Sequence, residues 1–190
     1  MRINKKTALT LGLLILLVIA GVFALRAGYD HFMKRMYPQK YSEIISQEAR
    51  KNNLDPALVY SVVKAESGFD PDAKSHAGAV GLMQLTPDTF EWLQSRREQN
   101  EAYKEEDLYT PEINVRFGCS FLALLLEKYG SLRTALCAYN AGIGTVNGWL
   151  EDPKVSKDGA NLDTIPYGET EKYVEAVLEN YRHYQQLYQY

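Results

Sequence analysis

Residues 55–67 have the sequence Asp-Pro-Ala-Leu-Val-Tyr-Ser-Val-Val-Lys-Ala-Glu-Ser, and they combine a helix start with an apolar face. An aspartate at the N-cap followed by a proline at the first helical position predicts that a helix begins here. Leu58, Val62 and Glu66 then recur every four residues, so they share one side of that helix. The sequence therefore places the Glu66 carboxylate at the end of the stripe that faces the core.

This position has a chemical consequence for Glu66. Burial without a partner disfavours the charged form of a carboxyl, so its pKa rises. A carboxyl that keeps its proton near neutral pH can serve as a general acid. The alternative is a glutamate at a frayed helix end that reaches solvent past Gly68, because most carboxylates at helix ends are solvated.

Helix signals recur along the rest of the chain. Thr86-Pro87 and Thr110-Pro111 repeat the pattern of a cap followed by proline, and few segments alternate as strands would. We therefore expect a mostly α fold, with further helices at about residues 44–49, from 87, 111–129, 131–140 and 168–187. The helix at 111–129 is the main core candidate, because its apolar residues repeat with helical spacing. Two glycine-containing segments, 75–84 and 138–144, interrupt the helices and would let backbone approach a ligand closely.

Length and composition exclude several classes of function. A chain of 190 residues has room for one modest domain and an appendage. Its net charge of -3 and its lack of a lysine and arginine cluster argue against nucleic acid as a partner. The 3 histidines and 2 cysteines have no metal-ligand spacing, so we expect no metal and no other cofactor.

The appendage is an apolar segment near the N-terminus. No residue from Thr7 to Leu25 is charged, and a run of about 20 such residues spans a bilayer as a helix. A cleavable signal peptide is the alternative, but its apolar region would be only about 7–15 residues long, and Val22-Phe23-Ala24 is a mediocre cleavage site. We therefore favour an uncleaved anchor.

The expected organisation follows from that anchor. We predict a cytoplasmic tail at residues 1–6, a transmembrane anchor at 7–26, a juxtamembrane spacer at 27–40 and a folded domain at 41–190. Basic residues flank the anchor on both sides, so their distribution hardly discriminates between orientations. A short N-terminal tail normally stays inside, which places the folded domain outside the cytoplasm as a single-pass protein of the cell membrane.

Such a location raises the question of a disulfide between Cys119 and Cys137. Both cysteines fall in helical patterns on either side of a turn at residues 130–131. In an antiparallel hairpin the two positions would be offset by roughly 7 Å, at 1.5 Å per helical residue, which is too far for easy bridging. We predict two buried free thiols.

Four ordered motifs resemble a known family. They are Glu66-Ser67, Gly81-Leu82-Met83-Gln84, Ala138-Tyr139-Asn140-Ala141-Gly142, and Tyr167-Gly168-Glu169-Thr170 followed by Tyr173-Val174. In order and spacing they resemble the soluble lytic transglycosylase (SLT) domain of bacterial cell-wall enzymes, over roughly residues 54–184.

The resemblance implies a lysozyme-like fold of the goose-lysozyme and SLT type, with a groove that holds a peptidoglycan glycan strand. It implies that Glu66 is the catalytic acid and base. Glu66 would protonate the oxygen that leaves C1 of N-acetylmuramic acid and then take the proton of the same sugar's O6 hydroxyl. The product would be a 1,6-anhydromuramyl end, formed without water during cell-wall remodelling.

The resemblance also implies substrate-binding roles. The hydroxyl of Tyr139 would reach the catalytic carboxylate, and the amides of Asn140 and Gln84 would hold sugar substituents. Ser75 would contact the substrate, and Glu169 would lie near the muramyl peptide. The alternatives are a core tyrosine, a loop asparagine, and a first-turn glutamate that only favours the helix dipole.

The remaining motif residues have supporting roles in this interpretation. They are Ser67, Met83 and Tyr173, of which Met83 and Tyr173 are expected to pack against the groove floor. Two positions depart from the family pattern: Thr86 stands where many relatives have methionine, and Tyr167 stands where phenylalanine is common. Neither departure touches the proposed acid.

We expect one catalytic carboxylate rather than two. The nearest candidates for a second, Asp70 and Asp72, lie in a turn where acids usually cap the backbone or face solvent, and a sugar's own N-acetyl group can replace the second carboxylate. Two other functions stay open: a muramidase of the goose-lysozyme kind that delivers water to C1, and an inactive wall-binding module of an envelope complex whose protein partners are unknown. A wall-opening role for a larger machine is compatible with the first interpretation.

Overall fold

The protein is described from a computed structural model that covers residues 4–96 and 102–190. Residues 1–3 of the predicted tail lie outside the described residues. The chain divides into two units, Met1–Pro38 and Gln39–Tyr190. Each is described separately below.

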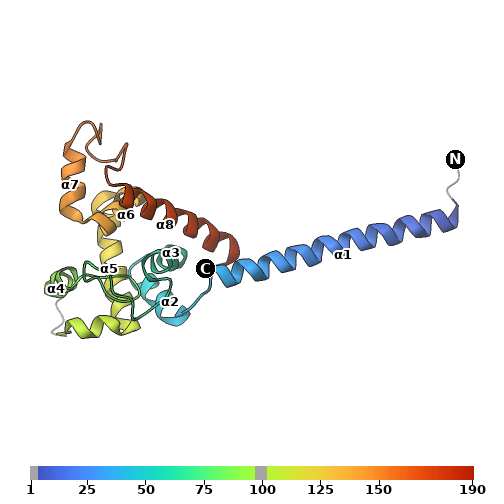
Figure 1. Cartoon of the computed structure of the whole chain (residues 1–190), viewed down its shortest axis with the longest axis horizontal. Helices are drawn as coiled ribbons and strands as arrows, with labels where there is room; N and C mark the ends of the chain where they lie inside the picture. The colour runs from blue at the N-terminus through green and yellow to red at the C-terminus, as the bar shows by residue number, and fades with distance from the viewer. Residues whose placement is uncertain (1–3, 97–101) are drawn as a thin grey trace. The chain divides into compact units, whose positions relative to one another are not determined.

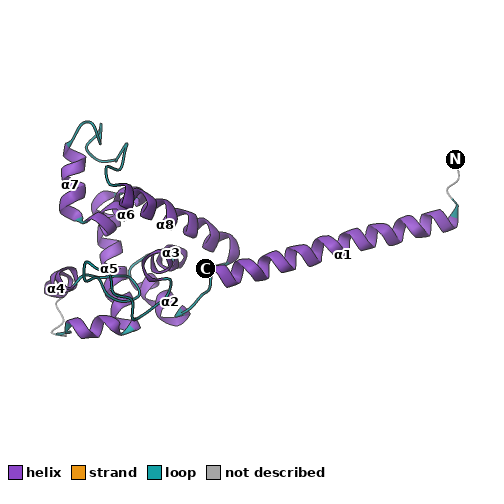
Figure 2. Ribbon diagram, in the orientation of Figure 1, coloured by secondary structure: helices purple, strands orange, loops and turns teal. Residues whose placement is uncertain are grey.

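The first unit consists of one helix, α1 (Lys5–Met36), which Figure 2 shows without interruption. Its segment Leu11–Met36 is long and apolar enough to cross a membrane, by length and composition. The helix continues past Arg26, so the segment predicted as a spacer is helical as far as Met36. Lys34 and Arg35 lie in its last turn, where cations interact favourably with the helix dipole.

The regular elements in the described part of the second unit are helices joined by loops, and no strand occurs there (Figure 2). This confirms the prediction of a mostly α fold. Its elements are α2 (Ser42–Lys51), α3 (Pro56–Ser67), α4 (Pro87–Ser95), the 3-10 helix η1 (Glu105–Tyr109), α5 (Pro111–Tyr129), α6 (Leu132–Ala141), α7 (Ile143–Glu151) and α8 (Gly168–Leu187). The sequence did not predict η1 or α7. Gly144 and Gly148 lie within α7, and glycine in a helix interior weakens the helical signal.

Helix α3 is the most enclosed element of this unit. Every residue from Ala57 to Val63 is buried, so the helix is covered on all sides. Helix α8 packs along it, as Figure 1 shows, and α2 packs against another side. Helix α5 packs against α2, α4 and α6, so it forms the second core layer that its apolar spacing predicts. The C-terminal end of α3, where Glu66 lies, is consequently held from several directions.

The caps expected from the sequence form at three helix starts, whereas Thr110, which precedes α5, makes no side-chain cap hydrogen bond. The Asp55 carboxylate accepts a hydrogen bond from the Ala57 amide at 2.8 Å, and its other oxygen accepts one from the Tyr181 hydroxyl of α8 at 2.6 Å. Thr86 caps α4 and Ser131 caps α6 through their hydroxyl groups. Asp55 thus both starts α3 and joins it to α8.

The two cysteines are free and buried, which confirms their prediction. Cys119 lies in α5 and Cys137 in α6, and these helices pack together. Burial raises the pKa of both thiols, that of Cys137 to about 11 and that of Cys119 further. Both groups are therefore protonated at physiological pH.

Candidate active site

The loop between α3 and α4 is held in place by the buried side chain of Asn114 on α5. Its amide nitrogen donates to the carbonyl oxygens of Val80 and Leu108, each at 2.8 Å. Its amide oxygen accepts from the backbone N–H of Met83 at 2.7 Å. One side chain thus satisfies three buried backbone groups, which fixes the Gly-Leu-Met-Gln segment against α5.

Two glycines make room for this arrangement. Gly81 has φ of +79°, and a Cβ there would collide with the Asn114 amide and the Leu108 carbonyl. A Cβ at Gly118 on α5 would collide with the Met83 side chain, which is fully buried. Gly81 therefore allows the loop to pack closely on α5, a role that the sequence did not predict.

Sequence reasoning missed Asn114, although a signal was present. Asn114 and Gly118 are four residues apart on the buried face of α5. An amide and a glycine in line on an otherwise apolar stripe indicate that a backbone segment packs there, because the amide needs polar partners and the glycine leaves space.

Ser67 joins the end of α3 to the same loop. Its hydroxyl lies 2.9 Å from the Leu82 carbonyl oxygen, to which it donates, and it accepts from the backbone N–H of Phe69 at 3.1 Å. The residue next to Glu66 is therefore tied to the residue next to Met83. This gives the Glu-Ser motif a definite structural reason.

Tyr139 on α6 binds the loop rather than the carboxylate. Its buried hydroxyl donates to the Met83 carbonyl oxygen at 2.9 Å, whereas the resemblance implied a contact with Glu66. The two groups are neighbours nonetheless: burial raises the pKa of Tyr139 well above its usual range, and the Glu66 carboxyl raises it further. Tyr139 therefore lies near the Glu66 carboxyl, while its hydroxyl proton is donated to the Met83 carbonyl oxygen.

The Glu66 side chain is partly accessible, yet protein surrounds its carboxyl closely. Desolvation by burial raises the pKa of Glu66 to about 7, and the Tyr173 hydroxyl of α8 opposes part of that rise. The Tyr173 hydroxyl is buried and has no hydrogen-bond partner of good geometry among the described residues. Its interaction with the Glu66 carboxyl nevertheless lowers the pKa of Glu66 and raises that of Tyr173. Tyr173 thus lies next to the carboxyl, beyond the packing role predicted for it.

The side-chain amides of Gln84 and Asn140, which were predicted to hold sugar substituents, each use one polar atom in hydrogen bonds within the protein. The Gln84 side-chain nitrogen donates to the carbonyl oxygens of Ala73 and Gly81, each at 3.0 Å, which leaves its oxygen as an acceptor. The Asn140 side-chain oxygen accepts from the Thr170 hydroxyl at 2.8 Å, which leaves its nitrogen as a donor. Asn140 is exposed, so this donor is accessible.

The other candidates lie on the exposed surface. Ser75 accepts a hydrogen bond from the Ala79 backbone N–H at 3.0 Å and so closes a turn. Glu169 is exposed in the first turn of α8. The Asp70 carboxylate accepts from the Asp72 backbone N–H at 3.0 Å, which confirms that it caps its own turn.

A cavity of about 480 Å³ lies between α4 and the junction of α6 with α7. Its lining includes Thr86, Asp88, Thr89, Trp92, Phe121, Tyr139, Asn140, Gly142 and Ile143. Glu66 is near this cavity, because its carboxyl acts electrostatically on Tyr139, which lines it. Aromatic faces combined with a few polar groups suit a sugar ring, which has apolar faces and a polar edge. Thr86, one of the two departures from the family pattern, both caps α4 and lines this cavity.

The titratable side chains do not form a metal site in the described part of the chain, where no group of three or more His, Cys, Asp or Glu comes together. The chemistry that this arrangement offers is proton transfer by a single carboxyl. Its pKa lies near neutrality, so it can both donate and accept a proton at physiological pH.

Comparison with known proteins identifies the family. The family model described as the transglycosylase SLT domain matches residues 43–161, which is more than half of the chain. The chain belongs to this family, as its four motifs predicted.

The relatives include soluble and membrane-bound proteins. The soluble lytic murein transglycosylase of Salmonella typhimurium is 32% identical over 161 residues, which cover 82% of this chain and 25% of the relative. The membrane-bound lytic murein transglycosylase C of Mannheimia succiniciproducens is 32% identical over 121 residues, which cover 57% and 33%. The chain therefore spans about a quarter of the length of the soluble relative.

Solved structures confirm the predicted lysozyme-like fold of this family. An inactive glutamate-to-glutamine mutant of the lytic transglycosylase Slt from Pseudomonas aeruginosa aligns with a TM-score of 0.69 and 30% identity, over 81% of this chain and 25% of that one. The 70 kDa soluble lytic transglycosylase of Escherichia coli aligns with a TM-score of 0.71 and 25% identity over the same shares. A complex of the 70 kDa soluble lytic transglycosylase with bulgecin A gives a TM-score of 0.72.

Replacing Asn114 tests the anchoring of the loop. Asn114→Leu has a similar volume but leaves the carbonyl groups of Val80 and Leu108 and the N–H of Met83 buried without partners. We expect the free energy of unfolding to fall by about 3 kcal/mol. Denaturant titration of the full chain in detergent measures it. Gln47→Leu, which removes an exposed amide on α2, is the matched control and should change it by less than about 1 kcal/mol. Equal stability of Asn114→Leu and wild type would contradict the anchor.

Replacing Glu66 tests whether folding raises the pKa of its carboxyl. Because folding raises the pKa from 4.5 to about 7, the contribution of Glu66 to stability is fully present below pH 4.5 and is lost as pH rises through 7. Glu66→Gln has no such titration. The unfolding free energy of the variant should therefore rise relative to wild type by about 1–3 kcal/mol between pH 4.5 and pH 8, as denaturant titrations would show. A difference that stays constant with pH would contradict a raised pKa.

Proposed function

We propose that this protein is a membrane-anchored peptidoglycan lytic transglycosylase. It cleaves the β-1,4 bond between N-acetylmuramic acid and N-acetylglucosamine without water and leaves a 1,6-anhydromuramyl end, in cell-wall remodelling. The observation that carries the proposal is the Glu66 carboxyl, whose pKa burial raises to about 7 and which acts electrostatically on both Tyr139 and Tyr173. Tyr139 lines the cavity, whose own carboxylate, Asp88, is exposed. Both relatives described above are named lytic murein transglycosylases, which supports the same reaction.

The proton balance of the reaction requires one carboxyl. Protonated Glu66 donates its proton to the glycosidic oxygen as the bond from that oxygen to C1 of the muramyl residue breaks. The N-acetyl oxygen of the same sugar stabilises C1 in place of a second carboxylate. The Glu66 carboxylate then removes the proton from O6, and O6 bonds to C1. The proton is restored to Glu66, and no water is consumed.

The surroundings of Glu66 suit both halves of this cycle. Burial favours the neutral acid that the first half needs, and the Tyr173 hydroxyl favours the anion that the second half needs. A pKa near the working pH is the optimum for a group that both gives and takes a proton. The P. aeruginosa relative that lacks activity carries a glutamine in place of a glutamate, which supports a catalytic glutamate in this family.

The remaining groups bind the strand in this proposal. The free nitrogen of Asn140 and the free oxygen of Gln84 hold sugar substituents, and the ring of Tyr139 forms part of the cavity wall. Ser75 and Glu169 contact substrate that extends from the cavity over the exposed surface.

The proposed location follows from α1. Residues 7–26 anchor the protein in the cell membrane as a single span, with residues 1–6 inside and the domain at 41–190 on the extracytoplasmic side, where peptidoglycan lies. The apolar α1 helix and the relative named as membrane-bound support attachment to a membrane, and the proposed orientation rests on the short N-terminal tail. The anchor and the spacer at 27–40 would keep the cut close to the membrane.

Product analysis tests the reaction. We expect digestion of purified peptidoglycan by the full chain to release anhydromuramyl ends, identified by mass spectrometry as lighter by one water than reducing ends. Glu66→Gln should lower the rate by at least about 100-fold, because general acid catalysis contributes that much or more. Glu175→Gln, an exposed glutamate on α8, is the control and should cleave normally.

Three other outcomes would contradict part of the proposal. Reducing muramyl ends would indicate a hydrolytic muramidase. A wild type that binds peptidoglycan without cleaving it would indicate a wall-binding module. Undiminished cleavage by Glu66→Gln would remove Glu66 from the reaction.

The pH profile tests the role of Tyr173. Because the first step needs protonated Glu66, kcat/KM should fall as pH rises through about 7. The Tyr173 hydroxyl lowers the pKa of Glu66, so Tyr173→Phe should move this alkaline limb to higher pH. Tyr181→Phe removes a hydroxyl from the same helix at Asp55 and should leave the limb in place. An unmoved limb in Tyr173→Phe would refute the interaction.

A further inference from the structure

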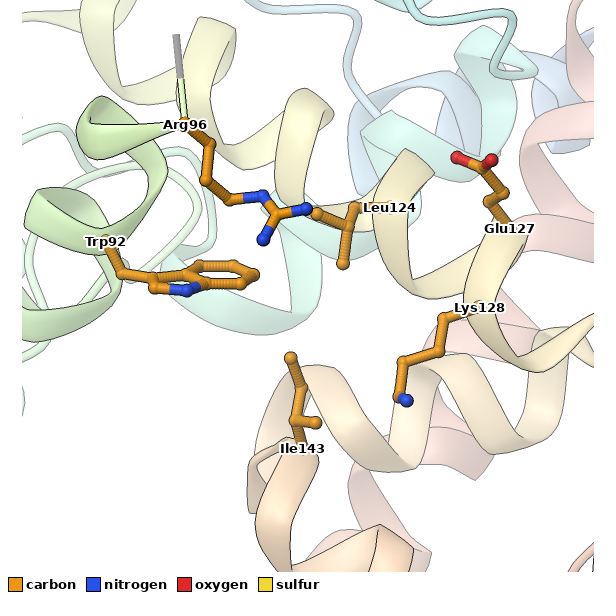
Figure 3. Close-up of a pocket in the computed structure, with 6 residues that line it drawn as sticks. All are labelled: Trp92, Arg96, Leu124, Glu127, Lys128 and Ile143. Carbon is orange, nitrogen blue, oxygen red and sulfur yellow. The ribbon is translucent and has the colours of Figure 1, made fainter.

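A second cavity, of about 520 Å³, adjoins the candidate active site (Figure 3). It is lined by Trp92, Arg96, Leu124, Glu127, Lys128 and Ile143. Trp92 and Ile143 also line the cavity beside Tyr139, so the two hollows share part of their walls. A ligand that fills the first and extends past Trp92 enters the second.

The lining of the second cavity combines two cations, one carboxylate and three apolar side chains. The Arg96 guanidinium lies over the Trp92 indole, 5.0 Å from the ring centroid. Figure 3 shows the Lys128 ammonium on the other side of the opening, toward Ile143, and the Glu127 carboxylate pointing away from Lys128. Arg96 and Lys128 are exposed, and neither forms an ion pair with another residue in the described part of the chain.

We propose that this cavity binds the peptide stem of the wall polymer through a carboxylate of that peptide. The inference rests on the proposed function, which brings a glycan strand into the neighbouring cavity. Arginine binds carboxylates with two parallel hydrogen bonds, and stacking on Trp92 holds its guanidinium in one orientation. Leu124 and Ile143 provide contact for the methyl and methylene groups of the peptide.

The chemistry of the two parts of the substrate favours the peptide as occupant. Sugar rings present hydroxyl and N-acetyl groups, which are neutral and need no pair of cations. Peptide stems branch from the muramyl residues and contain free carboxylates. The cations line only the second cavity, so they select the substrate without taking part in bond cleavage.

The test compares strands with and without peptides. Uncross-linked strands that bear peptides, and the same strands stripped by an amidase, are digested by the full chain and by Arg96→Gln/Lys128→Gln. We expect the double variant to lose about 10-fold or more in kcat/KM on peptide-bearing strands, the loss of one or two charge-assisted hydrogen bonds. Cleavage of stripped strands should change less than about twofold. Lys154→Gln, which removes an exposed cation outside both cavities, is the matched control.

The opposite outcomes are distinct. An equal loss on both substrates would show that the cations bind the glycan, including the lactyl carboxylate that stripping exposes, and would overturn the proposal. No loss on either substrate would overturn it as well. Arg96→Lys, which keeps the charge but not the bidentate geometry, should recover part of the activity on peptide-bearing strands.

A binding measurement separates this proposal from the proposed function. Free tetrapeptide stem is titrated into full-length Glu66→Gln, with and without the Arg96→Gln and Lys128→Gln changes, and binding is followed by calorimetry. Weaker binding after the changes supports the cavity even if the wild type proves unable to cleave peptidoglycan. Equal binding overturns the cavity even if the wild type cleaves normally.

Discussion

The buried amide of Asn114 is the constraint on which the rest of the site depends. Its oxygen accepts a hydrogen bond from the Met83 backbone N–H, and the Met83 carbonyl oxygen accepts one from the Tyr139 hydroxyl. Tyr139 in turn lies near the Glu66 carboxyl. Ser67 provides a further link, because its hydroxyl, at the end of α3, donates a hydrogen bond to the carbonyl oxygen of Leu82, the residue before Met83. The position of the carboxyl thus depends on Asn114 and Ser67, which do not line the cavity, and on Tyr139, which does. Such indirect support is what holds a reacting group within the small tolerance that catalysis requires.

The same construction makes the carboxyl energetically unfavourable. The ionised Glu66 carboxylate would be more favourable in water than in this site. The surrounding protein removes water from it and so raises its pKa. The structure tolerates this because α3 is covered on every side, so the end of the helix has little freedom to reorient. Under the proposed function, stability and catalysis oppose each other at Glu66, whereas Asn114 supports both.

Much of this could be predicted from the sequence, because the decisive signals were local. Caps and prolines placed the starts of α3 and α4, and the spacing of Leu58, Val62 and Glu66 indicated a carboxyl on the core side. The acceptor of the Tyr139 hydroxyl could not be predicted, because it depends on where another segment's carbonyl group lies. The place of Tyr173 beside Glu66 depends in the same way on how α8 packs against α3. Helix α7 was missed because its two glycines favour a turn locally, and packing outweighs that preference.

The buried cysteines have a consequence for chemical durability. Only the thiolate attacks a disulfide or reacts readily with oxidants, and burial raises the pKa of Cys119 and Cys137 far enough to keep both protonated. A folded domain of this kind can therefore work in an oxidising compartment with two reduced thiols. It needs no oxidoreductase to pair them correctly during folding, and it offers no exchange partner to neighbouring proteins once folded.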